Sequence, residues 1–184
     1  MTRFARAAAA LSLSVAAACN PQAPKSNPSP SSRASAPAAT ATPLVLKITG
    51  KGTAGRPIRF SHQVHNRVDY DLLASSFVSK GPQGDQRAIF QNAHVTFRDA
   101  KGATVVANAP QALVDQTADT VTLIGGVHAG TSSGMMLQCT TLVYARATAM
   151  LHGTGAVVVT DPQGFKATGS SFDSDLSLTH MQMR

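Results

Sequence analysis

The stretch Ala109-Pro110-Gln111-Ala112-Leu113-Val114-Asp115 decides the fold, because its pattern of small and apolar residues returns twice at a fixed step of 30 residues. It reappears in 139–145, which begins at Cys139, and in 169–175, which begins at Gly169. A gapless repeat of this size is typical of one supersecondary unit that is copied along the chain, each copy burying its apolar face against the next. The sequence therefore predicts a stack of similar units rather than a domain built around one site.

Within each copy the apolar residues alternate with polar ones, as in Val121-x-Leu123 and Val157-x-Val159. This period of two is that of a half-buried strand, and helical spacing is absent. Between the runs lie 99–102, 132–134 and 161–164, each of which ends in a glycine that suits a hairpin turn. Each repeat is therefore predicted to contain two strands and two turns.

Composition is consistent with a single folded domain whose interior is aliphatic. The chain has 184 residues, no Trp, few aromatic residues and a formal net charge of +7. Such a charge permits an anionic partner without requiring one, because the basic residues are scattered and form no long run. Nucleic acid is not predicted as a partner, since no basic stripe with interleaved aromatic residues is present.

The N-terminus has the pattern of an export signal. Arg3 and Arg6 precede an apolar run that ends in small residues before Cys19, which resembles a bacterial lipoprotein signal. We expect a signal peptide over 1–18, lipidation at Cys19 and a Pro/Ser/Ala-rich tether over 19–43, followed by the folded domain over 44–184. Ordinary signal-peptide cleavage and an uncleaved anchor are the alternatives.

Few residues carry reactive chemistry. Cys139 occupies a repeat position held elsewhere by Ala and Gly, and so it is interpreted as a small buried residue. His62-x-x-His65 lacks a third ligand for zinc, and Asp173 and Asp175 are expected to face solvent. Since no catalytic triad, phosphate loop or dinucleotide fingerprint appears, we predict no catalytic residues, no metal site, no cofactor and no enzyme activity.

Two further stretches carry a family resemblance. Leu123-Ile124-Gly125-Gly126-Val127 leads to a turn at Gly134, and 153–157 leads to a second turn at Gly164. With the repeat and the export signal, these motifs resemble the lipopolysaccharide-transport proteins of the LptC/LptA (OstA-like) family over roughly 70–183. A single domain behind a membrane anchor is more similar to LptC than to LptA, although the usual LptC has a transmembrane helix where this chain has a predicted lipid anchor.

The resemblance implies an all-β fold, a twisted open β-jellyroll (β-taco) of antiparallel strands whose interior holds the acyl chains of lipopolysaccharide. Such a conduit needs an aliphatic lining, because moving about a dozen methylenes through water costs on the order of 10 kcal/mol. The alternating positions would supply that lining, although they could equally pack a closed core. The predicted groove residues are Phe97, Val121, Leu123, Val127, Leu142, Val157 and Phe172.

An open jellyroll also has free strand edges that could pair with a neighbouring protein. We expect edges at a first strand around 44–49 and a last strand around 176–183, with Leu176, Leu178 and Met181 as the partner edge. The resemblance implies an LptA-like periplasmic partner, an ABC transporter of the LptB/LptF/LptG type and attachment to a membrane, the inner membrane being favoured over the outer.

Three other functions stay open at the level of sequence. The first is a structural envelope lipoprotein with a sealed repeat β-scaffold, and the second is a soluble LptA-like bridge protein. The third is a hydrolase or metal-dependent envelope enzyme, which a role for His62 or His65 would favour.

Overall fold

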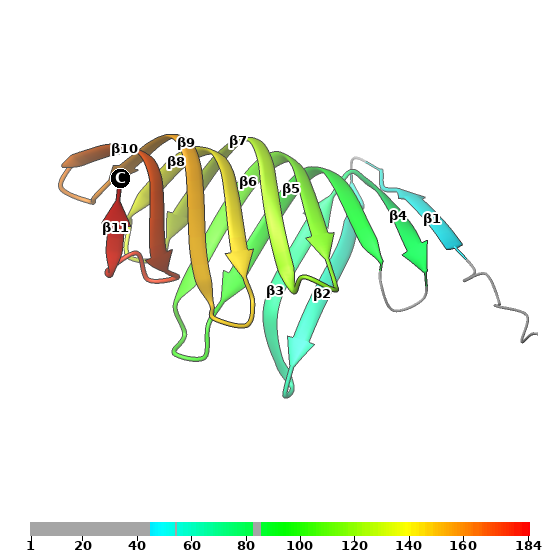
Figure 1. The fold of residues 1–184 in the computed structure, drawn as a ribbon. Coiled ribbons are helices and arrows are strands. Elements are labelled where there is room, and N and C mark those ends of the chain that lie inside the picture. The colour runs from blue at the N-terminus through cyan, green and yellow to red at the C-terminus, as the bar shows by residue number, and fades with distance from the viewer. Residues whose placement is uncertain (1–44, 54, 83–85) are drawn as a thin grey trace, which may run out of the picture. The chain divides into compact units, whose positions relative to one another are not determined.

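The computed structural model describes residues 45–53, 55–82 and 86–184 of the chain. Within these ranges the chain forms eleven strands and no helix (Figure 1). The first five strands are β1 (Val45–Lys51), β2 (Ile58–Val64), β3 (Arg67–Ala74), β4 (Ser76–Pro82) and β5 (Arg87–Arg98). The other six are β6 (Thr104–Asp115), β7 (Thr120–Thr131), β8 (Met136–Ala145), β9 (Met150–Thr160), β10 (Lys166–Asp175) and β11 (Met181–Met183).

The eleven strands belong to one antiparallel sheet that does not close into a barrel. Its order is β1-β4-β5-β6-β7-β8-β9-β10-β11, and a side branch runs from β5 through β3 to β2. The prediction of an open, all-β, antiparallel fold is therefore confirmed. Within the described residues, β1, β2 and β11 each pair with a single neighbour, so the sheet has three free edges.

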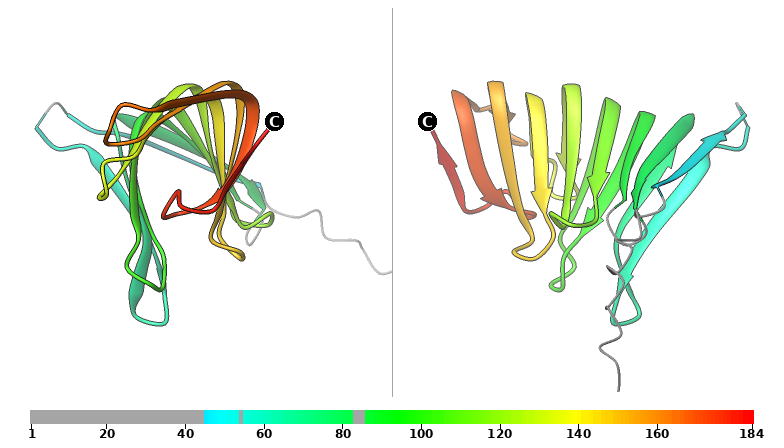
Figure 2. Two further views of the ribbon diagram at one scale, coloured as in Figure 1. Left: turned by 90° about the vertical axis from the view of Figure 1, so that its left-hand side faces the viewer. Right: turned by 45° about the vertical axis from the view of Figure 1, so that its right-hand side comes forward.

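The long strands of this sheet are bent at their middles. The register shifts at mid-strand in the pairs from β6–β7 to β9–β10, where a bulge interrupts the ladder. An end-on view shows the strands arching over a common ridge and descending on both sides (Figure 2). We call the side that contains β2 and β3 the β3 wall, and the side that contains β1, β4 and β11 the β4 wall.

The repeat corresponds to pairs of strands, as predicted. Residues 109, 139 and 169 lie at the bends of β6, β8 and β10. Equivalent positions of the repeat therefore occupy the same place in alternate strands of the sheet. The predicted turns close the hairpins with a positive φ at Gly102, Gly134 and Gly164. Asp161 supports the last of these turns, because its Oδ1 accepts hydrogen bonds from the backbone N–H groups of Gln163 and Phe165 at 2.9 and 2.8 Å.

The C-terminal strand is shorter than the sequence predicted. The expected strand around 176–183 contains only Met181–Met183 as β11, and 176–180 form a turn. Leu176 and Leu178 are buried in that turn, so the prediction that they lie on the free edge was wrong. The apolar alternation continues past the end of β10 because these two leucines cap the interior rather than extend the strand.

No helix in the described part of the chain is long and apolar enough to cross a membrane.

Candidate functional site

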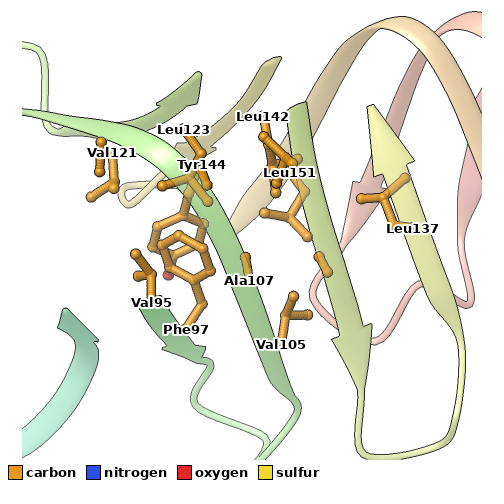
Figure 3. Close-up of a cluster of buried hydrophobic side chains, with 14 of the residues drawn as sticks. Val95, Phe97, Val105, Ala107, Val121, Leu123, Leu137, Leu142, Tyr144 and Leu151 are labelled. Carbon is orange, nitrogen blue, oxygen red and sulfur yellow. The ribbon is translucent and has the colours of Figure 1, made fainter. Parts of the chain in front are cut away.

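The interior between the two walls is the largest apolar region of the molecule. Side chains from both walls meet there in one cluster of buried hydrophobic residues, part of which is shown in Figure 3. Leu, Val, Ala, Phe and Tyr dominate this cluster, because the inward positions of the alternating strands carry them. The interior therefore has the aliphatic character that the sequence predicts.

The structure brings the seven predicted groove residues together in this cluster. The β3 wall supplies Phe97, Val127 and Val157, and the β4 wall supplies the other four. Each of the seven is at most 1% exposed, so the walls pack directly against each other at these positions. The next residue after Val127, His128, is exposed on the outer surface as the alternation predicts.

An aromatic and hydrogen-bonded contact joins the walls near the middle of the sheet. The ring centroids of Phe97 and Tyr144 lie 4.6 Å apart, and the two rings lie against each other in Figure 3. The Tyr144 hydroxyl donates a hydrogen bond of 3.1 Å to Oδ1 of Asp69, a buried residue of β3. We call the contact of Asp69, Phe97 and Tyr144 the wall latch.

Sequence reasoning missed the wall latch. A signal existed at Tyr144, which occupies an inward repeat position held by Val114 and Ser174 and so places a buried hydroxyl that needs a partner. The partner Asp69 is 75 residues away in the chain, and no local pattern points to it.

Charged groups surround the latch on the side of β2. The ring of His62 stacks on Tyr70 with centroids 5.5 Å apart, and its Nδ1 is 3.7 Å from Oδ2 of Asp69, too long for a hydrogen bond. Burial, assisted by the nearby Arg146, lowers the pKa of His62, and the charge of Asp69 opposes this change. Arg146 forms an ion pair with Asp119 and lies 6.0 Å from the centre of the Tyr70 ring.

The interior opens at the C-terminal end of the sheet into an apolar pocket of about 470 Å³. Val159 and Met181 line it together with residues of three turns, and Phe165 at its edge is 72% exposed. Phe165 therefore presents apolar surface to solvent at the edge of an apolar pocket. We call this space the C-terminal pocket; its apolar lining residues are Met135, Val159, Pro162, Phe165, Ala167, Leu178 and Met181.

A second apolar pocket lies among the first strands. It has a volume of about 200 Å³ and is lined mainly by Ile48, Phe60, Phe77, Phe90 and Val114. Both pockets adjoin the buried cluster, so an apolar lining extends from the first strands of the sheet to the last.

The residues with possible reactive chemistry do not form a site. His62 stacks on Tyr70, whereas His65 lies in the exposed turn between β2 and β3. Asp173 and Asp175 lie on the outer surface, where they are paired with His152 and His180 respectively. Among the described residues, no group of three or more His, Cys or Asp side chains could hold a metal ion.

Cys139 is a free, buried residue at the bend of β8, as its repeat position predicts. Burial raises the pKa of its thiol to about 11, so at neutral pH the thiolate that a nucleophile or metal ligand requires is scarcely populated.

The remaining predicted residues fall into two groups. Met181 lies on β11, half-buried against the core, with Leu176 and Leu178 in the preceding turn. Cys19, the signal segment 1–18 and the tether 19–43 lie outside the described residues.

Comparison of the sequence with protein-family models finds no matching family, and comparison with curated proteins finds no matching relative.

Proposed function

We propose that this protein is a membrane-anchored periplasmic component of lipopolysaccharide transport, which binds lipid acyl chains between its two walls and passes them to an LptA-like partner. The observation that carries this proposal is the aliphatic lining that extends through an open sheet to the C-terminal pocket. An acyl chain transferred along this lining would avoid the cost of entering water, about 0.8 kcal/mol for each methylene.

The packed interior sets a condition on this function. Because the seven inward residues are at most 1% exposed, a chain can enter between the walls only if they separate. The C-terminal pocket is the natural entrance or exit, since Phe165 and Met181 already present apolar surface there. The buried hydrogen bond between the walls, from Tyr144 to Asp69, involves no residue that lines the C-terminal pocket.

In this proposal the domain binds its partner at the free edge of β11 and the membrane through Cys19. The free edge of β11 adjoins the C-terminal pocket, so a β-jellyroll that pairs with this edge would place its own groove next to the pocket. An ABC transporter of the LptB/LptF/LptG type would supply the energy, and lipidation at Cys19 would hold the domain at the inner membrane.

The burial of the same seven residues also favours a second function, a structural envelope lipoprotein whose interior is sealed. In that case the aliphatic lining is an ordinary core, and no lipid enters it.

Photocrosslinking from the C-terminal pocket distinguishes the two functions. A benzophenone amino acid replaces Phe165, which faces the pocket and is so exposed that the substitution leaves the core intact. The matched control replaces Lys166, the adjacent and oppositely directed residue on β10. We expect a lipopolysaccharide adduct in cells from position 165 and none from position 166.

A second pair of probes, at Val127 and His128, tests whether acyl chains reach the middle of the interior. Adducts at 165 and 127 would support a conduit between the two walls. If folded protein yields no adduct at either inward position, the transport proposal fails and the sealed scaffold is favoured.

A further inference from the structure

The outer surface of β1, β4 and β5 combines positive charge with exposed aliphatic side chains. Phe77, Ser79 and Phe90 face the interior, so the alternate residues of β4 and β5 point outward. We call this surface the basic outer face and define it by the outward residues Val45, Lys47, Val78, Lys80, Arg87 and Ile89.

Three basic residues lie in one row across this face. The register pairs Lys47 with Lys80, and Lys80 with Arg87. Like charges directly opposite each other on neighbouring strands are destabilising. Of these three residues, Arg87 forms an ion pair with Asp115. Neither Lys47 nor Lys80 lies within 4.0 Å of a carboxylate of the described residues. Among the described residues, no carboxylate therefore forms an ion pair with the two lysines of this row.

Lys and Arg residues are also concentrated in the first part of the domain, which contains the basic outer face. Between residues 45 and 98 there are eight Lys or Arg residues against three Asp, whereas between 99 and 184 there are four against six. The first strands thus form a basic end of the sheet and the last strands an acidic end. The positive charge of the first strands attracts an anionic partner.

Aliphatic side chains stand between the charges of the basic outer face. Val45 is 57% exposed, Val78 43% and Ile89 40%. Basic residues interleaved with exposed aliphatic ones match the interface of an anionic bilayer, where the charges meet headgroup phosphates and the apolar groups enter the acyl boundary. The face carries no aromatic ring on which nucleic-acid bases could stack.

The basic outer face lies where the described part of the chain enters the domain. The 44 residues that precede Val45 include the predicted anchor Cys19, and the chain enters the domain through β1, whose outer surface is part of the face. The segment between the anchor and β1 spans up to about 70 Å when extended, so the anchor leaves this end of the domain within reach of the membrane.

We infer that the basic outer face docks on the anionic surface of the membrane that holds the anchor. Docking orients the domain with its first strands at the bilayer and its C-terminal pocket away from it. The inference rests on the anchor proposed at Cys19, but it does not depend on whether the interior carries lipid or is sealed.

Binding to vesicles tests this surface. The protein used is the full chain with Cys19→Ser, so that acyl chains do not hold it to the bilayer, and the vesicles contain either phosphatidylglycerol with phosphatidylcholine or phosphatidylcholine alone. The variant Lys47→Gln/Lys80→Gln removes the two lysine charges of the row. The matched control Lys101→Gln/Lys166→Gln removes two exposed charges elsewhere.

We expect the partition coefficient on phosphatidylglycerol vesicles to fall about 25-fold in Lys47→Gln/Lys80→Gln, or about fivefold for each basic residue, and by less than about twofold in the control. The apolar segment 1–18 is common to all variants and does not contribute to the difference. A cooperative thermal unfolding transition at or above that of the unsubstituted protein shows that both variants are folded, since all four side chains are exposed.

Two results would overturn the inference. One is an equal loss of binding in both variants, which would show that net charge alone attracts the vesicles. The other is equal binding of the unsubstituted protein to vesicles with and without phosphatidylglycerol.

Discussion

At the scale of residues, the wall latch joins the two walls by a buried hydrogen bond and an aromatic contact. Tyr144 reaches from the β4 wall to Asp69 on the β3 wall, and Phe97 packs against its ring. Losing the hydroxyl would leave a buried carboxylate oxygen without its donor, which typically costs about 1–3 kcal/mol. The hydroxyl of Tyr144 therefore stabilises the contact between the walls by satisfying a buried carboxylate oxygen of Asp69.

Both tyrosines of the chain, Tyr70 and Tyr144, lie in this region. We expect both hydroxyls to lose their protons at a higher pH than an exposed tyrosine does. Burial raises the pKa of Tyr70 to about 12, and burial with the nearby Asp69 raises the pKa of Tyr144 as well. Because the folded pKa values are raised, their contribution to stability is fully present below the unfolded pKa of about 10 and is lost as the pH rises further. We expect no tyrosinate absorbance from the native protein near pH 10, and normal titration in denaturant.

Tyr144→Phe provides the control for this titration, since it should remove one of the two late steps and leave that of Tyr70. Native tyrosinate appearing at the pH of the unfolded chain would contradict the closed interior, because it would place the rings in water.

At the scale of elements, the bends of the strands create the two walls. At these bends the register shifts and a glycine lies against a residue of the neighbouring strand. Examples are Gly125 beside Pro110 and Gly155 beside Thr140. Gly155 has a φ of +74, and the Thr140 hydroxyl donates a hydrogen bond of 3.0 Å to its carbonyl. Bulges of this kind bend a strand, which lets the two halves of each of these strands lie in different walls.

The bend at Gly155 should tolerate no side chain. A Cβ there would lie 2.6 Å from Oγ1 of Thr140, in addition to the strain of a positive φ. Gly164 has a similar φ of +89 but open space around its Cα, so Gly164→Ala measures the strain alone. We expect Gly155→Ala to lower the free energy of unfolding by at least about 1 kcal/mol more than Gly164→Ala does, measured by urea denaturation. Equal losses would mean that the contact with Thr140 relaxes without cost.

At the scale of the whole molecule, the two walls share their strands and their core, so neither can fold without the other. The strands β5 to β10 each contribute one half to each wall. A domain connected in this way should unfold as one cooperative unit, with local opening confined to its ends.

The two tyrosines make this cooperativity measurable, because the chain contains no Trp. Tyrosine fluorescence reports contact between the walls, and far-UV circular dichroism reports the strands. We expect the two signals to give one coincident urea transition. A fluorescence transition at lower urea than the loss of circular dichroism would show instead that the walls separate before the sheet unfolds.

Much of the fold could be predicted from the sequence, because the signals that specify it are local. The step from Ala109 to Cys139 to Gly169 predicted the repeating strand pairs, and the glycines at 102, 134 and 164 predicted the turns. Val127 and His128 were assigned to opposite faces for the same reason, since side chains alternate along a strand. The prediction failed at Leu176 and Leu178, because alternation continues through a turn when its residues cap a core.

The sequence by itself determined a repeat of paired strands with an aliphatic interior, because the periodicity of apolar residues and the chemistry of turns act over a few residues. Only the tertiary structure decided that the two walls pack against each other, that Asp69 meets Tyr144, and that the apolar surface is exposed at the C-terminal pocket. These features depend on contacts between residues far apart in the chain, and an inward-facing Val has the same pattern whether it faces another side chain or a lipid.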